Sequence, residues 1–226
     1  MPSAGRIGFR VLPAPPRLPA ALLARFRGMS AANLADAMGR FNWMDPGITA
    51  RCGLGLAGPA VTVRCRPADN LMVHKALALA EPGDIVVVDT CGNTTSAVIG
   101  ELMASTAHAK GLGGIVVDGA IRDVEAITRL GLPAFSRSVS PGGCDKDGPG
   151  EVNVPISCGG VVVMPGDLVV GDRDGVAVVP RGEAEAVLEL VTQLMAGEQK
   201  RLAEIAAGQL YRPEIDAALR QKGVIE

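Results

Sequence analysis

Three charged residues near the middle of the chain are spaced so that they could hold a cation and an anionic substrate together. They are Asp118, Arg122 and Asp123, and they close the segment GGIVVDGAIRD. The apolar residues 115–117 predict a buried strand that runs into a turn at Gly119. Strand ends in α/β folds often carry ligand sites, where two carboxylates and a guanidinium could bind a hard cation and a carboxylate. An ion pair that fixes a surface turn would explain the same residues.

A second segment, just upstream, predicts a helix whose first turn could bind a carboxylate. The strand DIVVVD over residues 84–89 precedes GNTTSAVIGELMASTAHAKG, in which residues 93–96 are typical helix starts. We therefore expect a helix over residues 94–110. Gly100 weakens this pattern, which indicates either close backbone approach or the true start of the helix. Free N–H groups near residues 100–103 would then suit a carboxylate, although a small residue packing a helix on a sheet explains Gly100 equally well.

Composition favours a globular enzyme over several other classes of protein. With 226 residues, 48% of them hydrophobic, the chain can bury one sizeable core. A net charge of −2 without a basic run, and only 3% aromatic residues, disfavour a nucleic-acid partner. We find no apolar stretch of about twenty residues, so we expect no membrane span. Five cysteines without a CxxC pair, and no recognisable secretion signal, indicate reduced thiols and a cytoplasmic location.

Several motifs that could indicate a dinucleotide site, a calcium site or a cysteine nucleophile are better explained by structural roles. The glycines of GLGG at 111–114 follow a helix and precede a strand, the reverse of the order in a dinucleotide-binding turn. GDRDG at 171–175 lacks the remaining ligands of a calcium loop and predicts a tight hairpin turn. His74 and His108 fall on helical patterns, and we expect both to be structural or surface residues. No histidine lies next to Cys91 in sequence, which disfavours a nucleophilic role.

The elements expected along the chain alternate between helix and strand in the middle and are short β segments on either side. This pattern predicts an α/β fold with mixed layers rather than a simple Rossmann sheet. Residues 1–28 are expected to form a flexible N-terminal arm, residues 29–208 the domain, and residues 209–226 a C-terminal extension. The expected elements are a capped helix at 30–38, a glycine-rich loop entering a strand at 53–66, helices at 70–80, 94–110, 123–130 and 182–207, strands at 84–89, 114–118 and 133–136, a mobile loop at 140–150, and β segments at 152–155, 161–163, 167–171 and 175–179.

The sequence resembles the RraA-like family over most of its length, from about residue 33 to residue 208. The resemblance rests on GELMASTAHAKGLGGIVVDGAIRDVEAI, DNLMVHKALALAEPGDIVVVD, GLPAF and VNVPISCGGVVVMPGDLVVGDRDGVAVVP, which follow the family's order. That family includes metal-dependent 4-hydroxy-4-methyl-2-oxoglutarate / 4-carboxy-4-hydroxy-2-oxoadipate aldolases and regulators of RNase E activity. The resemblance implies a three-layer β/β/α swivelling-domain fold, with mixed sheets and a C-terminal helix.

The resemblance also implies roles for individual residues. Arg122 matches the arginine that grips the carboxylate and ketone oxygen of pyruvate, and Asp123 matches the carboxylate bound directly to a divalent metal. The backbone amides of the segment that begins at Gly100, chiefly those of Leu102 and Met103, match the groups that hold the pyruvyl carboxylate.

Two acidic residues complete the implied site. Glu101 takes the place of an acid, often aspartate, that orients water at the metal, and its longer side chain leaves open how closely it approaches. Glu198 resembles a glutamate that a neighbouring subunit supplies from its C-terminal helix, although Glu204 also fits the register. The resemblance therefore implies a homotrimer or homohexamer with active sites between subunits.

With these roles, the resemblance implies a divalent-metal-dependent pyruvate aldolase, and a metal held by one carboxylate and waters suits Mg²⁺ or Mn²⁺. Such an enzyme would cleave 4-hydroxy-2-oxo dicarboxylic or tricarboxylic acids and would also decarboxylate oxaloacetate, because both reactions release the enolate of pyruvate. A lysine Schiff base is disfavoured, because none of Lys75, Lys110 and Lys146 lies at an apolar strand end.

Two alternatives remain open at the level of sequence. The chain could be a non-catalytic regulator that binds an RNA-processing enzyme, since one fold can serve both functions. It could also act on another 2-oxo acid. Specificity would then lie in residues such as Asn42, Arg51 and Asn70 and in the loop 140–150.

Overall fold

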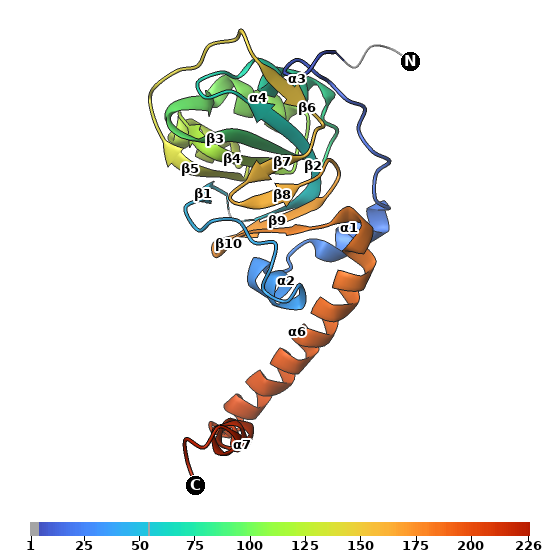
Figure 1. Cartoon of the computed structure of the whole chain (residues 1–226), viewed down its shortest axis with the longest axis vertical. Coiled ribbons are helices and arrows are strands. Elements are labelled where there is room, and N and C mark those ends of the chain that lie inside the picture. Colours follow the sequence, from blue (N-terminus) through green and yellow to red (C-terminus); the bar gives the residue numbers. More distant parts are fainter. Residues whose placement is uncertain (1–4, 54) are drawn as a thin grey trace.

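One long strand, β2 (Leu56–Cys65), connects the two halves of the main sheet. The computed structural model describes residues 5–53 and 55–226. Residues 60–64 of β2 pair in parallel with β3, whereas residues 56–59 pair antiparallel with β9. The strands in spatial order are β1 (Thr49–Cys52), β5 (Ala134–Val139), β4 (Gly114–Ile121), β3 (Ile85–Ile99), β2, β9 (Leu168–Asp172) and β10 (Gly175–Val179), and β6 (Gly150–Val152) is added to β2 (Figure 1).

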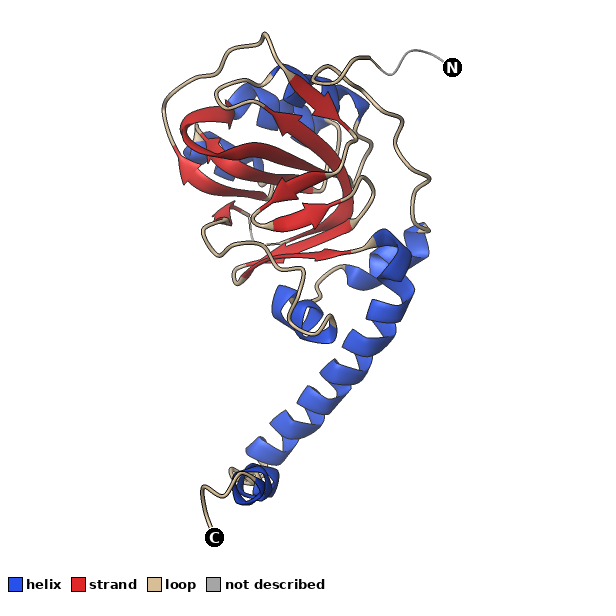
Figure 2. Cartoon of the chain, in the orientation of Figure 1, coloured by secondary structure: helices blue, strands red, loops and turns tan. Residues whose placement is uncertain are grey.

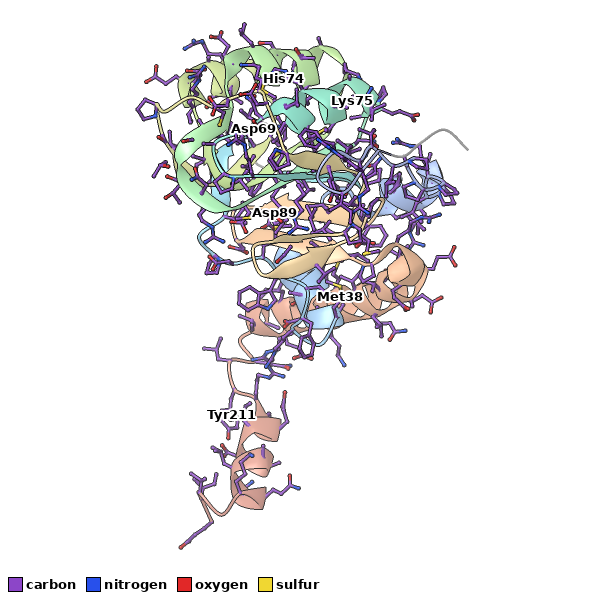
Figure 3. The ribbon with its side chains drawn as sticks, turned by 45° about the horizontal axis from the view of Figure 1, so that its top comes forward. Met38, Asp69, His74, Lys75, Asp89 and Tyr211 are labelled. Carbon is purple, nitrogen blue, oxygen red and sulfur yellow. The ribbon has the colours of Figure 1, made fainter. Side chains whose placement is uncertain are left out.

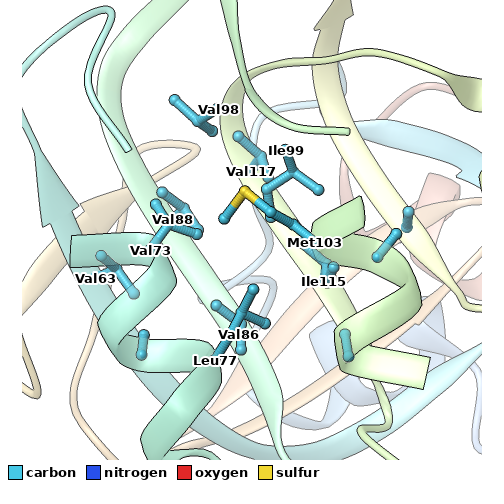
Figure 4. Packing of buried hydrophobic residues seen from close by; sticks show 14 of the residues in the cluster. Val63, Val73, Leu77, Val86, Val88, Val98, Ile99, Met103, Ile115 and Val117 are labelled. Atoms are coloured by element: carbon cyan, nitrogen blue, oxygen red, sulfur yellow. The ribbon is translucent and has the colours of Figure 1, made fainter. Parts of the chain in front are cut away.

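The central strands are buried on both faces, which accounts for their nearly continuous apolar sequences. Val86 and Val88 of β3 face helices α3 (Leu71–Leu79), α4 (Glu101–Ala109) and α5 (Val124–Leu130). The alternate residues Ile85 and Val87 face a β layer formed by β9, β10 and the hairpin of β7 (Ile156–Cys158) and β8 (Val161–Val163). Figure 2 shows these layers, and Figure 4 shows the helix-side core. The predicted three-layer β/β/α fold is confirmed.

Three further helices cover the outer side of β9 and β10. They are α1 (Ala20–Phe26), α2 (Ala31–Ala37) and α6 (Ala184–Ala206), and α6 follows a short 3₁₀ turn over Arg181–Glu183. The buried residues of α6 all lie between Ala184 and Val191. The rest of the helix extends away from the body and leads to α7 (Pro213–Gln221), which has no buried residue (Figure 1). The long helix expected at 182–207 is confirmed, whereas α1 and α7 were not predicted.

The described part of the expected N-terminal arm packs against the domain. Backbone hydrogen bonds join Gly8 to Gly150, and Arg10 and Leu12 to Val152, so that this segment lines the edge of β6. The prediction of a flexible arm is wrong for these residues, because they satisfy the backbone groups of an otherwise open sheet edge. The domain boundaries themselves stay a prediction.

Residues 93–99, expected to begin a helix, instead continue strand β3. Ala97 pairs with Ala120 of β4, and its N–H donates to the carbonyl of Gly142 at 2.8 Å. The Asn93 side chain accepts hydrogen bonds from the backbone N–H groups of Thr95 and Ser96, and thus forms a local turn rather than a helix cap. The helix begins only at Glu101.

Gly119, expected to form a turn, lies inside strand β4. A Cβ atom at this position would lie 2.2 Å from Oγ1 of Thr90. The glycine is therefore required because β3 and β4 approach closely there, and the strand continues to Ile121.

The remaining predictions concern caps, turns and cysteines. Ser30 caps α2 by accepting from the N–H groups of Ala32 and Asn33, and β9 and β10 form the expected hairpin. His108 is exposed on α4. All five cysteines are free. Among the described helices, none is both long and apolar enough to cross a membrane.

Candidate functional site

A cavity of about 250 Å³ opens at the carboxyl ends of the parallel strands. The segments that follow β2, β3, β4 and β5 each contribute to its wall, which is the usual position for a ligand site in such sheets. Its lining residues are Asn70, His74, Ala97, Gly100, Glu101, Leu102, Met103, Arg122, Asp123, Gly143, Cys144 and Lys146. Six of the residues that the sequence singled out as candidates therefore meet in one place: Gly100, Glu101, Leu102, Met103, Arg122 and Asp123.

Arg122 and Asp123 lie directly after β4 and stay partly exposed to the cavity. The N–H of Arg122 donates to the carbonyl of Ile99 at 2.9 Å, which fixes the end of β4 against the end of β3. The guanidinium Nε lies 3.6 Å from Oδ2 of Asp123, and the two side chains are 47% and 42% exposed. Asp123 has a φ of 58°, in the left-handed region that aspartate tolerates better than most residues.

Gly100 allows the backbone at the start of α4 to approach this pair. The N–H of Glu101 donates to Oδ2 of Asp123 at 3.0 Å. A Cβ on Gly100 would lie 2.6 Å from the same oxygen and 3.1 Å from Cγ and Nε of Arg122. Both expectations for Gly100, close approach and the helix start, are confirmed.

The first turn of α4 presents backbone donors to the cavity. Leu102 and Met103 occupy this turn, where amide groups have no helical carbonyl to pair with. The Met103 side chain is buried against Val73 and Val88, as Figure 4 shows, which anchors the turn on the core. By contrast, Leu102 is 85% exposed at the rim.

The opposite wall contains polar side chains whose combination the sequence did not indicate. The Nδ2 of Asn70 donates to the carbonyl of Val98 at 3.1 Å, while its buried Oδ1 has no partner among the described residues. One turn later on α3 lies His74, whose pKa is lowered by burial and by the charge of Lys146. Burial raises the pKa of the Cys144 thiol, and the nearby carboxylates of Asp69 and Asp145 raise it further.

Asn70 was expected only as a specificity residue, and His74 only as a structural one. Their spacing of four residues places them on one face of α3, and this spacing was the available signal. Lys146 was considered by itself only for Schiff-base chemistry, but it belongs to the loop 140–150 that was expected to carry specificity, and Gly143, Cys144 and Lys146 of this loop do line the cavity. Of the other specificity candidates, Asn42 and Arg51 do not line the cavity.

Asp118 does not belong to this cavity. Its Oδ2 accepts the N–H of Gly159 in the β7–β8 turn at 2.7 Å, and its Oδ1 accepts from Nε of Arg137. Arg137 also contacts Asp45 at 3.2 Å. Asp118 thus anchors the backbone of the β7–β8 turn, so the three charged residues of the central segment do not form one site: only Arg122 and Asp123 line the cavity.

The donor set of the cavity fits a hard cation with few protein ligands. Asp123 offers a carboxylate. Glu101, the first residue of α4, lines the same cavity. In the part of the chain that the structure describes, no three His, Cys, Asp or Glu side chains form a metal-binding cluster. A single carboxylate completed by water and substrate suits Mg²⁺ or Mn²⁺, whereas zinc prefers several His or Cys ligands.

Glu198 is not near the cavity of its own chain. It lies exposed on α6, where its Oε2 accepts from Nδ2 of Asn33 at 2.7 Å. Glu204 contacts Arg201 at 3.1 Å. Neither glutamate lines the cavity, so the supply of one of them by a neighbouring subunit stays a prediction.

Comparison with known proteins shows the family to which the chain belongs. The family model RraA-like (Aldolase/RraA) matches residues 31–178, so the chain belongs to the RraA-like family. A relative from Halalkalibacterium halodurans, provisionally named 4-hydroxy-4-methyl-2-oxoglutarate aldolase, is 46% identical over 146 residues, which cover 65% of this chain and 70% of the relative.

Solved structures show the same fold. An uncharacterised protein from Pseudomonas syringae superposes with a TM-score of 0.78 at 26% identity, and the match covers 86% of this chain and 96% of that one. Streptomyces coelicolor RraAS2, described as an unusual member of the RNase ES inhibitor RraA protein family, superposes with a TM-score of 0.71 at 29% identity, covering 85% of this chain and 98% of that one. The family thus contains proteins named as enzymes and proteins named as inhibitors.

Proposed function

We propose that the protein is a divalent-metal-dependent pyruvate aldolase that cleaves 4-hydroxy-2-oxo acids of the 4-hydroxy-4-methyl-2-oxoglutarate type. The observation that carries this proposal is the meeting of Arg122, Asp123 and the first turn of α4 in one cavity. A cation site, a guanidinium and free backbone amides are the groups that a 2-oxo carboxylate requires. The relative from Halalkalibacterium halodurans carries a matching name.

Groups of the chain would act on substrate atoms on both sides of the C3–C4 bond, which breaks in the reaction. The amides of Leu102 and Met103 bind the substrate carboxylate, and Arg122 binds that carboxylate together with the 2-oxo oxygen. Glu101 accepts the proton of the C4 hydroxyl through a water molecule, and the C4 oxygen forms a carbonyl on the departing half of the substrate. The C3–C4 bond breaks as this carbonyl forms, and the electron pair of that bond forms the enolate of pyruvate. Arg122 stabilises the negative charge on the enolate oxygen, and the proton that Glu101 accepted returns through water to C3, which completes pyruvate and restores the carboxylate of Glu101.

Asp123 would hold the cation, Mg²⁺ or Mn²⁺. When bound, the cation supplies Lewis-acid stabilisation of the negative charge on the 2-oxo oxygen. Because decarboxylation of oxaloacetate yields the same enolate, we also assign that activity to this cavity. Glu198 from a neighbouring subunit would close the cavity in a trimer or hexamer. The five free thiols suit a cytoplasmic protein.

The test is pyruvate release from a panel of 4-hydroxy-2-oxo acids and from oxaloacetate, with Mg²⁺ and after EDTA treatment. We expect activity only with the divalent cation. Full activity after exhaustive chelation would contradict a metal-dependent aldolase, and no pyruvate from any substrate would contradict the aldolase itself.

A regulatory function is the second candidate, and the likeness to the Streptomyces coelicolor inhibitor-family protein favours it. The protein would then bind an RNase E-type enzyme and lower its rate of RNA cleavage. The two functions are separable, because Arg122→Ala should abolish pyruvate release without changing inhibition of the RNase.

A further inference from the structure

We propose that Asp69 is a positioning residue that holds two walls of the substrate cavity in register. It connects the start of α3, which carries Asn70, with the loop that carries Lys146. This inference rests on the proposed function where it concerns the reaction. The connection itself is a structural statement that can be tested without turnover.

Asp69 is a carboxylate buried to 1% exposure, and backbone amides from both walls surround it. Its Oδ1 accepts the N–H of Leu71 at 2.9 Å, in the first turn of α3. Its Oδ2 accepts the N–H groups of Asp147 at 2.9 Å and Gly148 at 2.8 Å, in the loop after β5. One carboxylate therefore joins two segments that are more than seventy residues apart in sequence.

Backbone pairing strengthens the same connection. The N–H of Asn70 donates to the carbonyl of Asp145 at 3.0 Å, and the N–H of Asp145 donates to the carbonyl of Ala68 at 2.9 Å. Lys146 thus lies between Asp145 and Asp147, both of which are fixed to the start of α3. Asn70 directly follows Asp69 in sequence. Both cavity side chains consequently depend on this one junction for their positions.

The charge of Asp69 suits a permanent anchor rather than a proton carrier. Burial alone would raise its pKa, but the hydrogen bonds from Leu71, Asp147 and Gly148, with Arg66 at 3.4 Å, bring the pKa below the ordinary value. The group therefore stays ionised at neutral pH and accepts from all its donors. Figure 3 shows Asp69 and His74 at one end of the molecule, and the C-terminal segment, in which Tyr211 is labelled, at the opposite end.

An asparagine at this position keeps the shape but removes the charge and replaces one acceptor by a donor. In Asp69→Asn we expect amide hydrogen exchange at Asp147 and Gly148, and trypsin cleavage after Lys146, to accelerate. For oxaloacetate with Mg²⁺, we expect KM to rise roughly tenfold to a hundredfold and kcat to fall less, because displaced side chains lose contact with bound substrate.

The matched control is Glu151→Gln. Glu151 is also buried, at 4% exposure, and accepts from the backbone N–H of Gly8 and from Arg10. It anchors the N-terminal segment and lines no part of the cavity. We expect Glu151→Gln to lower the melting temperature but to leave KM and the exchange at Asp147 and Gly148 unchanged.

A double-mutant cycle separates positioning from general loss of structure. If Asp69 acts largely through Lys146, then Asp69→Asn should change KM much less in a Lys146→Ala background than in the wild type. Equal effects in both backgrounds would contradict action through Lys146. Should Asp69→Asn not fold, Arg66→Gln weakens the same junction, since Arg66 contacts both Asp69 and Asp145, and it should raise KM by a smaller factor.

The outcomes distinguish this inference from the proposed function. Wild-type protein that releases no pyruvate refutes the aldolase proposal, and the exchange measurement then still decides whether Asp69 joins the two walls. Unchanged exchange at Asp147 and Gly148 in a folded Asp69→Asn protein refutes the inference, whatever the activity. An active wild type with an unchanged KM in that variant refutes it as well.

Discussion

Gly100 shows how a residue without a side chain can define a site. It lets the N–H of Glu101 reach the carboxylate of Asp123, while the guanidinium of Arg122 lies against the same stretch of backbone. A methyl group there would occupy the space of the Asp123 oxygen at 2.6 Å. The atoms nearest to such a methyl group belong to the flexible side chains of Asp123 and Arg122. These side chains could move aside without destabilising the fold, but their movement would disturb the site.

We therefore expect Gly100→Ala to reduce pyruvate formation by roughly a hundredfold, with little change in melting temperature, because displaced groups lose their alignment with the substrate. Steady-state kinetics and thermal unfolding measure the two effects. The control is Gly182→Ala, since a Cβ at Gly182 meets no atom within 4 Å. Equal activity in both variants would show that this backbone approach is unimportant for the reaction.

Asp123 and Arg122 should fail in different ways when they are replaced. Asparagine also tolerates the left-handed backbone of Asp123, so Asp123→Asn tests the carboxylate without straining the chain. We expect it to lower activity by at least about a hundredfold and to abolish Mg²⁺ binding measured by calorimetry.

Arg122→Lys should keep Mg²⁺ binding but raise KM and lower kcat, because lysine lacks the planar two-pronged contact. Near-normal turnover in both variants would mean that the site lies elsewhere.

At the scale of the elements, the sequence predicted the buried strands better than it predicted the start of helix α4. Strands such as β3 and β4 begin where their apolar runs predicted, because burial on both faces leaves a strong sequence pattern. Residues 94–99 were wrongly expected to be helical, because polar residues that suit a helix start also suit a turn. Pairing with β4 and with Gly142, which a local pattern does not reveal, decided between them.

The site was predicted in detail where it followed a strand end. Where it depended on long-range contacts, Asn70 and the loop 140–150 were predicted only as specificity elements, and His74 was missed. Arg122 and Asp123 follow β4 directly, and their types pointed to their chemistry. Asn70, His74 and Lys146 reach the cavity from other segments. The loop of Lys146 is tied to the start of α3 through Asp69 and through the backbone of Asp145, and neither contact has a signature in the sequence near Lys146.

The junction between α3 and this loop should make stability depend on pH. A carboxyl whose pKa is lowered on folding stabilises the protein above its ordinary pKa of about 4 and loses that contribution as the pH falls through the lowered value. Asp69→Asn should therefore cost about 2 kcal/mol of unfolding free energy at pH 7, and less as the pH falls below about 4.

Asp167 provides a contrast of opposite sign, because burial raises its pKa. Protonation then favours the folded state, so the wild type should gain stability relative to Asp167→Asn as the pH falls. Thermal unfolding of the three proteins between pH 7 and pH 3 measures both trends. A parallel pH dependence in the Asp69 and Asp167 variants would contradict these assignments.

At the scale of the whole molecule, α6 extends farther than its own domain can cover. It has 23 residues and is about 34 Å long, yet its buried residues end at Val191. Beyond them, Leu202, Ile205 and Tyr211 are exposed by 57%, 42% and 60%. A long helix with uncovered apolar residues is typical of a surface that packs against another subunit. This arrangement supports the expected trimer or hexamer, in which α6 of one copy would carry Glu198 to the cavity of the next.

Subunit mixing tests this assembly directly, after sedimentation has established the oligomeric state. Arg122→Ala and Glu198→Ala proteins should each be inactive, because each lacks one half of every shared site. After exchange in equal amounts, roughly a quarter of the interfaces would combine two intact halves, and activity should recover to that extent. Glu204→Ala in place of Glu198→Ala decides which glutamate is shared, and Glu189→Ala, on the same helix, should remain active throughout. A fully active monomer, or mixed oligomers that stay inactive despite demonstrated subunit exchange, would show that each site is complete within one chain.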